Sequence, residues 1–153
     1  MSVHNRFEKE NSAMPRITGE SALGLAWAIA FFSSLSVLFI GEVLGQTPCF
    51  LCWFQRVFMF PLAIVLGLGL WWRDRSVGRY GIVLALGGGA VALWHMGLYT
   101  GVIPERIQPC TANGPSCTDE GQLIFGVPIP LLAFGAFMAI AILSALSLKE
   151  TQE

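Results

Sequence analysis

Four long stretches of the 153-residue sequence contain almost no charged side chains, and this feature constrains the fold more than any other. The first stretch, residues 21–40, holds twenty residues without Asp, Glu, Lys or Arg. A helix of that length rises about 30 Å, which is the thickness of the hydrocarbon layer of a bilayer. The other three stretches are residues 53–72, 80–101 and 130–148. The sequence therefore predicts an all-α integral membrane protein, built as a four-transmembrane-helix bundle.

The composition agrees with this prediction and argues against two other classes of protein. Of all residues, 54% are hydrophobic and 12% are charged, which leaves too little polar surface to cover a soluble globule. The nine Lys and Arg side chains form no basic stripe, so binding to nucleic acid is not expected. We expect a single membrane domain over residues 21–148, with cytoplasmic tails at 1–20 and 149–153.

Basic residues predict the orientation in the bilayer. Three Lys or Arg side chains lie in the N-terminal tail, three in the loop at 73–79 and one in the C-terminal tail, whereas the other two loops carry only Arg106. Short loops rich in Lys and Arg stay on the cytoplasmic side, so both termini are expected there. The two remaining loops then face outward, where disulfide bonds persist. They hold all four cysteines of the chain: Cys49, Cys52, Cys110 and Cys117.

Cys49 and Cys52 form a Cys-x-x-Cys motif where a short polar connection meets the second apolar stretch. Two thiols at this spacing can close a small disulfide ring or share a metal ion. If the second helix begins near Cys52, the unpaired N–H groups and positive dipole end of that helix favour a thiolate there.

Arg56 follows Cys52 by four residues, and so lies one helical turn further along the same face. A quinone head group can sit between the two, with the guanidinium hydrogen-bonded to a carbonyl oxygen. The alternative is that Arg56 reaches the lipid head groups or pairs with Glu42.

The second cysteine pair and one histidine are the remaining candidates. Cys110 and Cys117 enclose a turn-forming hexapeptide, and a bridge that closes so short a loop stabilises by only about 2.5 kcal/mol. Such a bridge is either a relay that opens and recloses or a structural staple. His95 lies toward the outer end of the third stretch, at about the depth of Arg56. It either hydrogen-bonds a quinone or is a satisfied packing residue.

Four sequence features together resemble one known family. They are Pro-Cys-Phe-Leu-Cys-Trp-Phe-Gln-Arg at 48–56, the basic loop at 73–79, the second cysteine pair, and Phe-Gly-Val-Pro-Ile-Pro at 125–130. In combination they resemble the DsbB/BdbC family of membrane disulfide-forming quinone oxidoreductases. The short spacing between Cys110 and Cys117 is closer to the BdbC-like branch than to the enterobacterial proteins with a longer outer loop.

The resemblance implies a thiol:quinone oxidoreductase of the bacterial cytoplasmic (inner) membrane that supports protein disulfide bond formation. In that scheme Cys49 and Cys52 form the quinone-linked disulfide, with Cys52 facing the quinone and Arg56 supporting it. Cys110 is attacked by the reduced thiol of a DsbA/BdbD-like thioredoxin-fold oxidase, and Cys117 is its bridge partner. Electrons then pass from the outer pair to the inner pair and on to the membrane pool of ubiquinone or menaquinone.

Two other functions stay open from the residues alone. Four thiolates at these spacings can bind zinc, although an oxidising compartment argues against it and the resemblance assigns no metal site. Alternatively, the chain is a structural four-span protein with two inert bridges. The vitamin K epoxide reductase family also combines a small helical bundle with Cys-x-x-Cys, but its motif follows the other cysteines in the chain.

Overall fold

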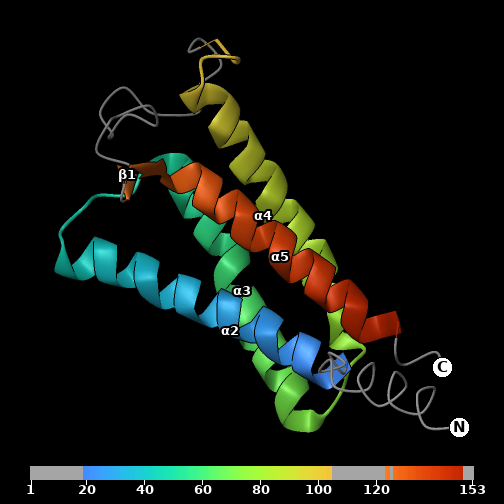
Figure 1. Ribbon diagram of the computed structural model, residues 1–153. Helices are drawn as coiled ribbons and strands as arrows, with labels where there is room; N and C mark the ends of the chain where they lie inside the picture. Colours follow the sequence, from blue (N-terminus) through green and yellow to red (C-terminus); the bar gives the residue numbers. More distant parts are fainter. Residues whose placement is uncertain (1–18, 105–122, 125, 150–153) are drawn as a thin grey trace, which may run out of the picture.

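Four long helices make up most of the computed structural model, which describes residues 19–104, 123–124 and 126–149 (Figure 1). All four helices are long and apolar enough to cross a membrane. The first span includes a π-helical turn, η1, that continues the first helix. The predicted four-helix membrane bundle is therefore confirmed. The helices are α2 (Gly19–Leu38), α3 (Phe50–Trp72), α4 (Val77–Tyr99) and α5 (Ile129–Lys149), and η1 spans Phe39–Val43.

The helix ends differ by a few residues from the expected spans, for local reasons. The first helical unit continues through η1 and ends before Gly45, which has a φ of +67° that favours glycine. α3 starts at Phe50 because Cys49 is extended and its carbonyl already accepts the N–H of Trp53 at 3.2 Å. The expected tails fall mostly outside the described residues, so the division into one domain and two cytoplasmic tails stays a prediction.

The four helices form a ring in which each helix packs against two neighbours. α2 and α4 both contact α3 and α5, and the contact between α4 and α5 is the most extensive. One buried core cluster contains Leu62 and Leu66 of α3 together with Phe137 and Ile140 of α5, and all four are fully buried. Since lipid tails are as apolar as these side chains, close van der Waals packing is what holds such helices together.

Small residues allow α4 to approach α5 closely. Gly88 lies against the aromatic ring of Phe137, and a methyl group added at Gly88 would overlap with that ring. Gly81, two turns earlier on α4, lies against Ser144 in the same way, with 2.9 Å between an added methyl and the Ser144 Oγ. Gly81 and Gly88 thus serve helix packing.

The turn between α3 and α4 marks one end of the bundle. Arg73 closes α3 in the left-handed conformation, with a φ of 54°. The Asp74 carboxylate accepts hydrogen bonds from the Ser76 hydroxyl and backbone N–H, which lower the pKa of that carboxyl. The Gly19 end of α2 and the Lys149 end of α5 lie toward this same end (Figure 1). The start of α3 and the end of α4 therefore meet at the opposite end.

A short antiparallel hairpin leads into α5. Its strands are β1 (Leu123–Ile124) and β2 (Val127–Pro128), with Leu123 opposite Pro128. Gly126 has a φ of +80°, which lets the chain reverse tightly. Cys110, Cys117 and Arg106 lie outside the described residues, so the proposed outer bridge is not tested.

The packing of Gly88 gives a stability prediction. Gly88→Ala should lower the free energy of unfolding by about 1–3 kcal/mol, because the new methyl group forces Phe137 out of its place in the core. The measurement is thermal or detergent-induced unfolding of the purified protein, followed by circular dichroism. Gly135→Ala on α5 is the matched control, since a methyl group there meets nothing within 4 Å. Equal effects of the two substitutions would contradict the packing argument.

Candidate redox site at the start of α3

Cys49 and Cys52 lie at the beginning of α3, where the sequence placed them. Cys49 is the residue just before the helix, with a φ of −67° and a ψ of 167°, and its side chain is fully buried. Its thiol donates a hydrogen bond to Cys52 Sγ at 3.0 Å. Small side-chain rotations bring two sulfurs at this separation to bonding distance. The two thiols are thus close enough to form a disulfide with little movement.

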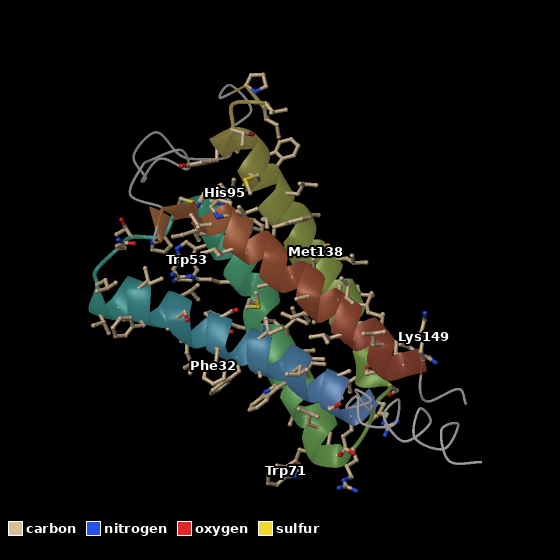
Figure 2. The ribbon with its side chains drawn as sticks, in the orientation of Figure 1. Phe32, Trp53, Trp71, His95, Met138 and Lys149 are labelled. Atoms are coloured by element: carbon tan, nitrogen blue, oxygen red, sulfur yellow. The ribbon has the colours of Figure 1, made fainter. Side chains whose placement is uncertain are left out.

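His95 of α4 covers Cys49 on the side of the bundle interior. Its Nε2 lies 3.9 Å from Cys49 Sγ, and the imidazole is fully buried. Its other ring nitrogen, Nδ1, lies 3.2 Å from Nε2 of Gln55. Figure 2 shows His95 at the same end of the bundle as Trp53, away from Trp71 and Lys149. His95 therefore contacts the cysteine motif directly, although 46 residues separate it from Cys49 in the chain.

Gln55 is a functional candidate that the sequence analysis did not single out. It is buried, with 7% of its surface exposed, and it lies on α3 three residues after Cys52. A signal was present in the sequence, because a polar side chain at that spacing falls on the same helix face as the cysteine. What the sequence could not show is that α4 places an imidazole opposite this amide.

A cavity of about 610 Å³ opens between α2, α3 and α5. Cys52, Gln55 and Arg56 contribute to its wall, and most other lining side chains are apolar. Cys49 and His95 do not line it. The two cysteines therefore have different surroundings: Cys52 faces the cavity, whereas Cys49 faces the imidazole. Cys52 and Arg56 both line the cavity, which agrees with the prediction that they lie close together. His95 lies behind Cys49 and does not line the cavity.

Contacts with α2 and with Trp53 fix the position of Arg56. Its Nη2 donates a hydrogen bond to the Val37 carbonyl at 3.0 Å, and its Cζ lies 5.3 Å from the centroid of the Trp53 ring. Gly41 leaves room for the guanidinium, since a methyl group there would be 3.4 Å from Nη2. Both Arg56 and Glu42 are described residues, and no ion pair joins them. The cation is thus held in the cavity wall by a backbone oxygen and an aromatic face.

A Cys-x-x-Cys at the head of a membrane helix, with Cys49 buried and Cys52 beside an apolar cavity that Arg56 also lines, is typical of a membrane thiol oxidoreductase. Residues 19–147 match the family model described as "Disulfide bond formation protein DsbB". The chain belongs to this family, which confirms the family that the sequence motifs indicated. It is therefore a multi-pass membrane oxidoreductase that forms disulfide bonds.

Curated relatives support the same assignment. The chain is 52% identical over 128 residues to a "Probable disulfide formation protein" of Metapseudomonas resinovorans, with 83% of this chain and 89% of the relative covered. It is 33% identical over 136 residues to the "Probable disulfide formation protein C 1" of Bacillus cereus (85% and 94% covered). A "Probable disulfide formation protein" of Deinococcus radiodurans is 34% identical over 135 residues (82% and 88% covered). No solved structure gives a significant match.

The different surroundings of the two cysteines predict different reactivity. In reduced protein with Cys110→Ser and Cys117→Ser, N-ethylmaleimide should modify Cys52 before Cys49, because Cys52 borders the cavity and Cys49 is fully buried. Peptide mass spectrometry after brief labelling measures the order. Unfolded protein is the control, in which both thiols should react alike. Faster labelling of Cys49 in the folded protein would contradict this site geometry.

Proposed function

We propose that this protein is a thiol:quinone oxidoreductase that reoxidises an extracytoplasmic DsbA/BdbD-like thioredoxin-fold oxidase and passes the electrons to membrane quinone. Family membership supports disulfide formation, and the electron acceptor, the partner and the route are the proposed parts. One observation carries the choice of acceptor: Cys52 and Arg56 share the wall of one largely apolar cavity of about 610 Å³. That volume is typical of sites for small organic ligands.

The chemistry of the cavity suits a quinone. An apolar wall accommodates a lipid-soluble ring, and the guanidinium supplies N–H donors for a ring oxygen. Because Arg56 is already held by Val37 and Trp53, little reorganisation is needed when negative charge develops on that oxygen. Gln55 offers a second polar group in the same wall. Ubiquinone and menaquinone both fit this description.

The proposed reaction balances as an exchange of two electrons and two protons. The reduced Cys49–Cys52 pair loses both and forms one S–S bond, while reduction of a quinone to a quinol takes them up. The Cys110–Cys117 disulfide oxidises the dithiol of the partner, and the resulting outer dithiol reduces the Cys49–Cys52 disulfide by thiol–disulfide exchange. The net result is one new disulfide in the partner and one quinol in the membrane.

The position of His95 beside Cys49 suggests a role other than the two that the sequence left open, a hydrogen bond to a quinone or packing alone. A hydrogen bond from Nε2 to Cys49 Sγ, 3.9 Å away, stabilises negative charge on that sulfur during exchange with the outer pair. We therefore assign His95 to Cys49, and Arg56 to the quinone.

For the orientation we propose an outward-facing site in the bacterial cytoplasmic membrane, with the Arg-rich turn and both termini in the cytoplasm.

The decisive experiment is an anaerobic turnover assay in detergent. Purified protein is mixed with a reduced thioredoxin-fold oxidase and a soluble quinone analogue, and quinone absorbance is followed. Quinone reduction that disappears with Cys52→Ser is the expected result. Absence of reduction by the unaltered protein, with its bridges inert to thiols, would instead support a purely structural membrane protein.

Removing the cation should impair the use of quinone specifically. Arg56→Ala should raise the apparent KM for quinone about tenfold or more, because a charged hydrogen-bond donor is lost from the cavity wall. Disulfide exchange with the partner should stay nearly intact. The control is Arg73→Ala, whose side chain is 83% exposed at the other end of the bundle. Loss of exchange with unchanged quinone kinetics would contradict the role given to Arg56.

The outer cysteine pair has its own test. Cys117→Ser should trap a mixed disulfide between Cys110 and the partner, because the thiol that resolves it is missing. Non-reducing gel electrophoresis followed by mass spectrometry of the adduct identifies the linked cysteines. Cys110→Ser is the matched control and should trap no partner. If neither variant forms an adduct, the pair is a structural staple.

A further inference from the structure

We propose that the reduced Cys49–Cys52 pair and His95 together form a binding site for a thiophilic divalent cation of the zinc class. The site exists only in the reduced protein, because each sulfur must be a thiolate to act as a ligand. A bound cation and a Cys49–Cys52 disulfide therefore exclude one another. This site differs from the four-cysteine zinc site considered from the sequence, since it uses one cysteine pair and a histidine of another helix.

The three ligand atoms are already close together. The two Sγ atoms and His95 Nε2 all lie within 4.8 Å of one another, with 3.0 Å between the sulfurs and 3.9 Å between Cys49 Sγ and Nε2. Tetrahedral zinc, with bonds of about 2.3 Å to sulfur and about 2.0–2.1 Å to nitrogen, places its ligands roughly 3.5–3.8 Å apart. The sulfurs must separate by somewhat less than 1 Å and the imidazole must approach slightly. Side-chain rotations supply movements of that size.

Charge favours the bound state in this buried location. Two thiolates neutralise a divalent cation, and the imidazole binds in its neutral form, so the complex carries no net charge. Two protons leave the thiols when the cation binds. Cys49 and His95 are fully buried, and in such surroundings a neutral complex is much less costly than isolated ions.

Gln55 supports the imidazole in the way that is usual for metal-bound histidines. When Nε2 binds a cation, Nδ1 carries a proton and needs an acceptor. The Gln55 amide lies 3.2 Å from Nδ1, and rotation of the amide group presents its oxygen to that proton. The ring is thereby held with Nε2 directed toward the sulfurs.

The cavity gives access to the site and leaves one coordination position open. Cys52 borders the cavity, whose wall also includes Gln46 and Thr47, both exposed on the connection before α3. Three protein ligands with a fourth position for water characterise exchangeable metal sites more than closed structural ones. Binding should therefore be reversible by a chelator. On the basis of the proposed function, an occupied site also blocks electron transfer to quinone.

Cobalt binding tests the site without measuring activity. Full-length protein with Cys110→Ser and Cys117→Ser, reduced and kept anaerobic in detergent, is titrated with Co²⁺. We expect one equivalent to bind, with a thiolate-to-cobalt charge-transfer band in the near ultraviolet and visible bands typical of tetrahedral cobalt. Zn²⁺ should displace it. The same protein with its Cys49–Cys52 disulfide formed should show neither band.

Variants identify the ligands. Cys49→Ser or Cys52→Ser should abolish the charge-transfer band, and His95→Gln should weaken binding at least tenfold. Gln55→Leu keeps all three ligands, so it should lower the affinity about tenfold while preserving the form of the spectrum. Reduced protein that gives no cobalt bands, oxidised protein that binds equally well, or a spectrum unaffected by Cys49→Ser would each overturn the proposal.

A second measurement separates this proposal from the proposed function. Zn²⁺ should inhibit quinone-dependent turnover of the unaltered protein, and a chelator should restore it. Normal turnover without cobalt bands would refute the proposed metal site and leave the proposed function supported. Cobalt bands in a protein that does not reduce quinone would support the proposed metal site and refute the proposed function.

Discussion

A helix that crosses a bilayer leaves its first backbone N–H groups without partners inside the helix, and this chain places its Cys-x-x-Cys motif at such a helix start. Elsewhere in the hydrocarbon layer, backbone groups are paired within the helices. The start of α3 is thus a place where N–H groups without a carbonyl partner earlier in the helix and the positive end of a helix dipole occur together close to the apolar interior. The proposed thiol chemistry relies on these two features, because a thiolate needs positive surroundings to form at a membrane.

Two different environments then act on two cysteines only three residues apart. Cys52 faces a cavity whose wall includes the guanidinium of Arg56, whereas Cys49 faces the imidazole of His95. Each sulfur thus lies near a different basic side chain. Such a division suits a pair that exchanges electrons with an apolar molecule on one side and with another disulfide on the other. The proposed cation site uses the contact of Cys49 with His95 and the access of Cys52 to the cavity.

Close packing of α4 brings this imidazole to the site. Gly88 and Gly81 lie directly against α5, so the two helices approach more closely than larger side chains would permit. The packing of α4 against α3 and α5 sets the position of its final turns, where His95 lies. Small residues in the middle of the bundle therefore affect the geometry of the redox site at its end, without touching it.

The sequence by itself determined the four membrane helices, the cysteine motif at a helix start and the family. Long uncharged stretches have only one stable structure in lipid, and Cys52 and Arg56 share a face because α-helical spacing is fixed. Only the tertiary structure decided that Gln55 and His95 form a pair, that His95 lies next to Cys49 and not in the cavity wall, and that Val37 and Trp53 hold Arg56. These contacts join different helices or depend on side-chain direction. They follow from how the helices pack, which residue spacing along one chain does not specify.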